Sequence, residues 1–229
     1  MYFYDWTMIL MLPGLLLGLW AQWKVKSAFA RYSRVPTRAG VPAGEVARHL
    51  LAQNGNTGVA IRQIGGELTD HYDPRDNSLS LSQNVYGSSS VAALGVAAHE
   101  AGHAMQKQEG YPFLKLRTLV APVVNIGSNL SWPIFLAGLV FSYEPLMNAG
   151  IILFAAVVVF ALITLPVEFD ASRRALRMLT EGGFVTEDER QGAKAVLTAA
   201  ALTYVASFVS AFMQLMRLVL LAGNNRRRD

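Results

Sequence analysis

Four long apolar stretches alternate with polar segments along the chain. They cover residues 6–23, 118–141, 146–167 and 195–222. A helix of about 18 to 20 apolar residues crosses the hydrocarbon core of a bilayer. Tryptophan, which favours the membrane interface, lies near both ends of the first stretch. The pattern predicts a mainly α membrane protein with several transmembrane helices.

Charged residues beside the apolar stretches predict how the chain crosses the membrane. Five basic residues follow the first stretch between residues 24 and 38, whereas only Asp5 precedes it. Because basic residues concentrate on the cytoplasmic side, we expect an uncleaved anchor with its N-terminus outside. Basic residues also precede the second stretch and follow the third. These two stretches should therefore form a hairpin whose outer ends are cytoplasmic.

The fourth apolar stretch is harder to interpret, because polar side chains recur along it. They are Thr203, Tyr204, Ser207, Ser210, Gln214 and Arg217. Crossing the membrane would also place the basic residues 226–228 outside, against the usual distribution. We favour a spanning or membrane-embedded helix, with packing against the catalytic region or a position in the interface as alternatives.

The polar segment between the first two apolar stretches predicts a small α+β region. Residues 41–53 have the spacing of an amphipathic helix, and residues 59–64 could form a short strand. Residues 70–77 are rich in turn formers, and residues 79–82 alternate with the period of a strand. Residues 88–106 are rich in alanine and follow helical spacing.

Composition and charge exclude several classes of function. The chain has no cysteine, so disulfides, thiolate zinc sites, iron–sulfur clusters and cysteine nucleophiles are all excluded. Only 16% of the residues are charged, against about 25% in a soluble domain. The net charge of +4 comes mostly from basic residues beside apolar stretches. We therefore assign that charge to membrane topology and expect no nucleic-acid partner.

The predicted alanine-rich helix contains the sequence His99-Glu100-Ala101-Gly102-His103. Histidines four residues apart lie on one face of a helix, so both imidazoles can reach a single ion. Glu100 lies about 100° round the helix from His99, where it is free to act on water instead of serving as a ligand. A metal ion lowers the pKa of a coordinated water to about 7, so this carboxylate can take its proton. The motif predicts a zinc-dependent hydrolase.

Two histidines leave a catalytic zinc site one protein ligand short. The predicted hairpin returns the chain to the same side of the membrane, where Glu168 and Asp170 begin a predicted helix. Residues two apart point about 200° apart, so these carboxylates cannot both face the metal. We favour Glu168, which shares a face with Ser172, over Asp170, which would turn toward Arg173 or Arg174. The alternative is that both carboxylates only stabilise the start of a helix.

Longer motifs surround these residues. They are His71-Tyr72-Asp73-Pro74-Arg75, Leu81-Ser82, Val85-Tyr86-Gly87 and the segments 97–106, 166–175 and 200–206. Together they resemble the YugP-type neutral zinc metallopeptidase family over most of the chain. The resemblance implies a bacterial, multi-pass membrane metallopeptidase with a zincin-like catalytic domain.

A more distant resemblance is to the HtpX and CAAX prenyl protease families. It implies that Glu168 is the third ligand and that Ala171 matches an alanine of their pattern. Ser172 stands where those families have an aspartate, so the residue that orients one histidine remains open, with Asp170 as the alternative.

Further residues have two interpretations each. The Leu79–Ser82 strand could bind an extended peptide by strand addition, or simply complete a small sheet. His71, Tyr86 and Tyr204 could each stabilise an oxyanion, although a structural role is the stronger expectation for any one of them.

We therefore expect a membrane-embedded zinc endopeptidase of the HExxH gluzincin type. One Zn²⁺ per chain would be bound by His99, His103 and Glu168, with Glu100 as general base, on the cytoplasmic side of the cell membrane. The substrate would be a peptide or membrane protein, with the lipid bilayer as surroundings and a homo-oligomer or membrane-protein partner left open. The alternatives are a non-catalytic zinc-binding scaffold and a zinc hydrolase of another amide bond.

These expectations divide the chain into five parts. They are the transmembrane anchor 1–23, the cytoplasmic catalytic region 24–117, the transmembrane hairpin 118–167, the third-ligand helix and loop 168–194, and the C-terminal apolar helix with its basic tail 195–229.

Overall fold

The computed structural model describes residues 6–226. Asp5 and the tail residues 227–229 lie outside this range. Asp5 and the basic residues of the tail were among the charges used to predict how the chain crosses the membrane. The described chain separates into two compact units. One contains residues 6–21, 116–165 and 203–226, and the other contains residues 22–115 and 166–202.

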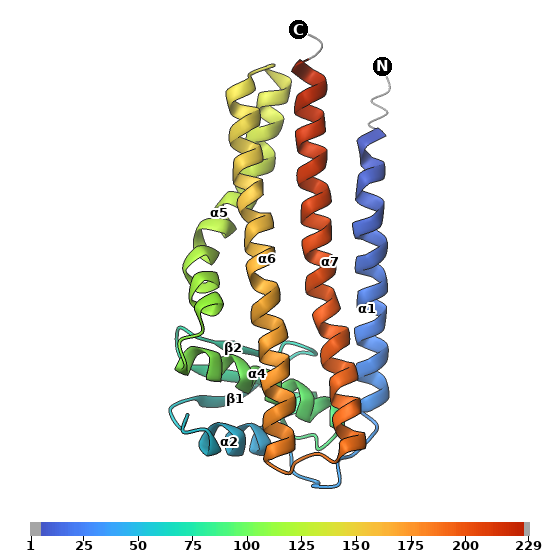
Figure 1. Cartoon of the computed structure of the whole chain (residues 1–229), viewed down its shortest axis with the longest axis vertical. Coiled ribbons are helices and arrows are strands. Elements are labelled where there is room, and N and C mark those ends of the chain that lie inside the picture. Colours follow the sequence, from blue (N-terminus) through green and yellow to red (C-terminus); the bar gives the residue numbers. More distant parts are fainter. Residues whose placement is uncertain (1–5, 227–229) are drawn as a thin grey trace. The chain divides into compact units, whose positions relative to one another are not determined.

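The described chain is mainly helical and has one small mixed sheet, as the sequence predicts. The elements are η1 (Trp6–Met11), α1 (Leu12–Tyr32), α2 (Ala43–Gln53), β1 (Ala60–Ile64), β2 (His71–Asp73), β3 (Ser78–Ser82), α3 (Gln83–Tyr86), α4 (Val91–Gln108), α5 (Pro112–Val140), α6 (Glu144–Glu181) and α7 (Glu187–Arg226) (Figure 1).

Four segments of the described chain are long and apolar enough to cross a membrane. They are Trp6–Tyr32, Pro112–Val140, Glu144–Glu181 and Glu187–Asn224, and each contains most of one apolar stretch seen in the sequence. Many large apolar side chains on them are exposed, such as Leu119 at 75% and Ile152 at 68%. Extended exposed apolar surface of this kind is typical of protein that contacts lipid.

The first unit packs its helices through small residues and a few large ones. A Cβ added to Gly14 would lie only 2.8 Å from the Cα of Ser210, so glycine permits the close approach of α1 and α7. Small residues at such crossings are common between membrane helices. Phe135 and Leu218 are fully buried in the core of this unit. Arg217 places its guanidinium 5.8 Å from the ring centroid of Trp132, within cation–π distance.

The second unit has a core shared by helices and the sheet. Helix α4 packs against α2 and contacts β2 and β3 (Figure 1). Leu50 of α2, Leu79 and Leu81 of β3, Leu94 of α4 and Leu179 of α6 are all fully buried in this core. The alternation of leucine and serine along β3 predicts a strand with both leucines on one face. In the structure that face packs into the core.

The sheet has the strand order β1-β3-β2, with β3 in the centre. β3 is parallel to β1, with Ala60 opposite Ser78, and antiparallel to β2, with His71 opposite Ser80. Beyond β2, Asp70 accepts a hydrogen bond from the backbone N–H of Ser82 at 2.7 Å. Both edges of β3 are thus occupied, so the proposed strand addition of a peptide to Leu79–Ser82 is wrong. The alternative interpretation, a strand that completes a small sheet, is confirmed.

Helix α6 differs from the prediction in its continuity. The sequence predicts a membrane stretch that ends near residue 167 and a new helix that begins at Glu168. The structure has one helix from Glu144 to Glu181, with Pro166 inside it. Glu168 and Asp170 are therefore interior residues, and their interpretation as helix-start carboxylates is wrong.

We predict that Gly102→Ala destabilises the protein. A Cβ at Gly102 would lie 2.7 Å from the carbonyl oxygen of Ala171, and a backbone atom of a helix cannot move aside easily. Overpacking of this kind costs about 1–3 kcal/mol, so the apparent melting temperature in detergent should fall.

Gly95→Ala is the matched control, because it makes the same change in the same helix. Its new Cβ would lie 3.6 Å from the Cβ of Ala193, an ordinary contact. Alanine has the higher helix propensity, so this variant should melt at or above the wild-type temperature. Equal melting temperatures for the two variants would contradict the close approach of α4 and α6.

Candidate metal centre

Three side chains of the second unit converge at one point. His99 and His103 come from α4, and Glu168 comes from α6. The Oε2 atom of Glu168 lies 3.2 Å from Nε2 of His99 and 3.6 Å from Nε2 of His103. One ligand atom from each residue lies within 4.8 Å of the other two. The three residues named from the sequence are therefore close enough to hold a single metal ion.

The local sequence explains why α4 can present both histidines to α6. Ser90 caps the helix by accepting a hydrogen bond from the backbone N–H of Ala93, which satisfies one of the free donors at a helix start. Gly102 is buried, and a Cβ there would lie 2.7 Å from the carbonyl oxygen of Ala171. Because glycine has no side chain, the backbone of α6 can come close enough for Glu168 to reach the imidazoles.

Both imidazoles are held through their second ring nitrogen. Nδ1 of His99 lies 3.1 Å from the hydroxyl oxygen of Ser172, and Nδ1 of His103 lies 3.0 Å from Oε1 of Gln106. When Nδ1–H donates to these oxygens, Nε2 carries the lone pair on the side of Glu168. Such partners orient metal-binding histidines. Ser172, which stands where the HtpX and CAAX prenyl protease families have an aspartate, is therefore the residue that contacts His99.

Gln106 is fixed by a buried polar network. Its side-chain amide donates to the carbonyl oxygen of Val167 and to Oδ2 of Asp170, both at 2.9 Å. Asp170 also accepts from Nε of Arg174 at 2.6 Å, and Arg174 donates to Glu109 at 2.7 Å. Because both amide hydrogens of Gln106 have acceptors, its oxygen is the atom that faces His103.

Glu100 lies beside the three convergent residues and is largely buried, with 8% of its surface exposed. Burial alone would lower the pKa of His103, but the carboxylate of Glu168 and the charge of Glu100 raise that pKa above its ordinary value. These two carboxylates favour positive charge at this position. A proton and a metal ion compete for such a site, since only the neutral imidazole binds a metal.

The structure separates the two carboxylates that the sequence left in competition. Glu168 reaches both histidines, whereas Asp170 forms an ion pair with Arg174, one of the two partners predicted for it. Gln106 is the functional residue that sequence reasoning missed. The available signal was a polar residue three positions after His103 in a buried, alanine-rich helix, because that spacing places it on the face of His103.

The structure shows contacts for two of the three oxyanion candidates. His71 is exposed on β2, and its Nδ1 lies 2.8 Å from the carbonyl oxygen of Thr69. Tyr86 packs its ring against α2, where a Cβ at Gly44 would lie 2.8 Å from it. Tyr204 belongs to the first unit. The contacts of His71 and Tyr86 favour structural roles for both.

Comparison with known proteins adds independent evidence. Residues 7–223 match the family described as "Putative neutral zinc metallopeptidase". The chain is also 45% identical over 217 residues to the "Putative membrane protease YugP" of Bacillus subtilis (strain 168). That alignment covers 95% of this chain and 96% of the relative. No solved structure matches the chain.

We predict that Gln106→Ala weakens metal binding without removing a ligand. Loss of a residue that orients a metal-binding histidine typically lowers affinity by about 10- to 100-fold. Competition with a chromogenic zinc chelator would measure the change. Gln108→Ala is the control, because Gln108 is exposed near the end of the same helix and its amide lies 3.4 Å from the carbonyl oxygen of Asn54. Equal zinc affinity in both variants would contradict the orienting role of Gln106.

Proposed function

The chain belongs to the neutral zinc metallopeptidase family, and from that premise we propose that it is a membrane-embedded zinc endopeptidase. The observation that carries the proposal is the convergence of His99, His103 and Glu168 within 4.8 Å, with Glu100 buried on the same helix as the histidines.

The donor set fits a zinc ion. Two imidazole nitrogens and one carboxylate oxygen are ligands that zinc accepts in catalytic sites. Three protein ligands leave a coordination position open, whereas a structural zinc site usually has four protein ligands. This count supports a catalytic centre over a zinc-binding scaffold. The fixed Nδ1 contacts of both histidines support the same assignment, because they hold the Nε2 atoms toward one point.

The residues of the chain divide the chemistry between them. Zinc, when bound, polarises the carbonyl under attack and lowers the pKa of water. Glu100 accepts the proton of the attacking water and then delivers it to the nitrogen of the leaving amine. His99, His103 and Glu168 would hold the ion, while Ser172 and Gln106 keep the imidazoles oriented. Arg174 and Asp170 act one contact further away, by fixing Gln106.

The same residues could attack other carbonyl groups, so a zinc hydrolase of another amide bond is the second candidate. Family membership and the protease name of the relative favour peptide bonds. We further propose a multi-pass protein of the cell membrane whose centre faces the cytoplasm. The basic residues 24–38 and 173–177, which flank apolar stretches, support that orientation. Its substrates would be peptides or membrane proteins.

Glu100→Gln should separate metal binding from catalysis. The amide keeps the size of the side chain but cannot accept the proton, so peptide cleavage should fall by about 10²- to 10⁴-fold while zinc content stays at the wild-type level. Elemental analysis and peptide hydrolysis of the purified protein in detergent would measure both. If the variant cleaves peptides at the wild-type rate, the scaffold or a different catalytic base becomes the better explanation.

Glu168→Ala should remove the metal itself. Loss of a ligand leaves two imidazoles for the ion, so the purified variant should contain little zinc and show no cleavage. Glu181→Ala is a matched control on the same helix, because Glu181 is exposed. The control should retain zinc. Wild-type zinc content in Glu168→Ala would assign the third ligand to another residue.

A further inference from the structure

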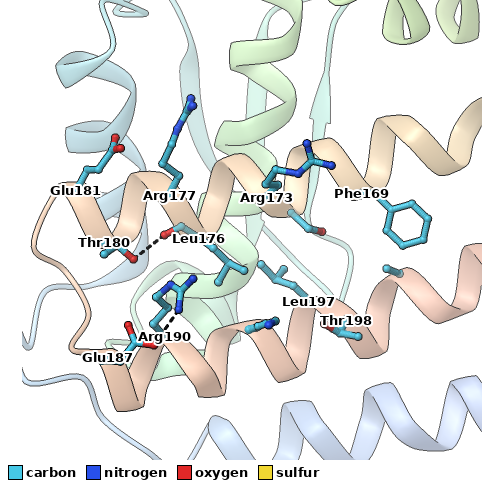
Figure 2. A pocket seen from close by; sticks show the side chains of 13 residues that line it. Phe169, Arg173, Leu176, Arg177, Thr180, Glu181, Glu187, Arg190, Leu197 and Thr198 are labelled. Atoms are coloured by element: carbon cyan, nitrogen blue, oxygen red, sulfur yellow. Dashed lines mark hydrogen bonds and ion pairs between the residues drawn. The ribbon is translucent and has the colours of Figure 1, made fainter.

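A groove of about 750 Å³ lies in the second unit between the end of α6 and the start of α7. The two helices run in opposite directions along it, so Phe169 and Thr198 lie at one end and Glu181 and Glu187 at the other (Figure 2). The two ends of the groove therefore differ in chemistry, which limits the kind of molecule that fits it.

The end at Phe169 and Thr198 reaches the apolar stretches of the sequence. Phe169 lies two residues after the third apolar stretch and is 45% exposed. Leu197, Thr198 and Ala201, which also line the groove, belong to the fourth apolar stretch, 195–222. Both stretches lie in helices that are long and apolar enough to cross a membrane. This end is therefore where the groove would meet the hydrocarbon core of the bilayer.

Basic side chains from both helices line the groove between its ends. They are Arg173 and Arg177 of α6 and Arg190 and Lys194 of α7. Arg190 forms an ion pair with Glu187 at 2.8 Å, whereas Arg177 and Lys194 are exposed and form no ion pair within the described part of the chain. Membrane orientation requires only that basic residues flank an apolar stretch. Their convergence on one groove goes further, because it makes positive charge available to a bound anion.

Helix geometry places these basic groups within reach of lipid headgroups. A helix rises 1.5 Å per residue, so Arg173 lies about 9 Å beyond Val167, the last residue of the third apolar stretch, and Arg177 about 15 Å beyond it. Lys194 directly precedes the fourth apolar stretch. The polar layer of a bilayer extends roughly 5–8 Å from the hydrocarbon core on each side, and long basic side chains reach along a helix to place their charge in it. Glu181, about 21 Å beyond Val167, lies outside this layer.

We propose that the groove binds an anionic phospholipid, with its phosphate at Arg177 and Lys194 and its acyl chains toward Phe169. The order along the groove, apolar at one end and basic beyond it, is the order of groups along such a lipid. Basic pockets between membrane helices bind anionic headgroups in this way. A soluble anion would use the basic side chains but not the apolar end. The inference goes beyond the proposed function and does not depend on it, because it uses only the groove and the membrane-length helices.

Lipid binding by the full-length protein in neutral detergent tests the groove. The protein would be titrated with phosphatidylglycerol or with phosphatidylcholine of identical acyl chains, and native mass spectrometry would measure the fraction that carries one lipid. Phosphatidylglycerol should bind about tenfold more tightly or better. Arg177→Gln combined with Lys194→Gln should weaken its binding by roughly 25-fold, about fivefold for each basic residue. Binding of phosphatidylcholine should stay at the wild-type level.

Lys26→Gln combined with Arg34→Gln is the matched control. It removes the same charge from two exposed residues that follow the first apolar stretch and lie outside the groove. This control should bind phosphatidylglycerol like the wild type. The single substitutions Arg177→Gln and Lys194→Gln should each weaken binding by about fivefold, which keeps the test decisive if the double variant is unstable.

Four results would overturn the inference. They are equal binding of the two lipids, a preference for phosphatidylglycerol that survives Arg177→Gln with Lys194→Gln, equal weakening in the control variant, and displacement of the lipid by inorganic phosphate or by a glutamate-rich peptide at a similar concentration. The third result would assign the attraction to overall charge, and the fourth would assign the groove to a free anion or a polypeptide. Each of these failures leaves the proposed function unaffected, because neither metal content nor cleavage is measured.

Discussion

The close approach of α4 and α6 at Gly102 is the constraint on which the candidate centre depends. The two histidines come from one helix and the carboxylate from the other, so their separation is set by how near the two backbones can come. A Cβ at Gly102 would lie 2.7 Å from the carbonyl oxygen of Ala171. A larger residue at this position would therefore move Glu168 away from the imidazoles. Small size here therefore serves the chemistry as well as the packing.

Polar contacts then convert that proximity into a defined arrangement. Each imidazole has a partner on the nitrogen that faces away from Glu168: Ser172 for His99 and Gln106 for His103. Buried polar groups cost free energy unless they are hydrogen-bonded, and here each contact that satisfies one group also positions the next. Arg174 continues this chain of hydrogen bonds, because it donates to Asp170 and to Glu109.

Much of the fold and most of the centre could be predicted from the sequence, for local reasons. The spacing of His99 and His103 places both on one face of a helix. The length of the apolar stretches predicts the long helices. The prediction failed where distant segments decide the outcome. Strand β2 has three residues within a turn-rich segment, and only its pairing with β3 makes it a strand. The continuity of α6 was hidden by Pro166 and by the change from apolar to charged residues. Gln106 was missed because its partners, Val167 and Asp170, become visible only when α6 is placed.

The hydrogen bonds of Gln106 have one further consequence. A free histidine exchanges between two neutral tautomers, and only one of them directs Nε2 to a metal. At His103 that choice follows from the fixed polarity of its neighbours: Val167 and Asp170 accept both amide protons of Gln106, so an oxygen faces Nδ1. A glutamate at position 106 would be nearly identical in size. Its carboxylate would face the oxygen acceptors of Val167 and Asp170 without a hydrogen to donate, so the arrangement that orients His103 would be lost. The folded chain thus selects the tautomer in advance, and an arriving ion meets a preorganised ligand.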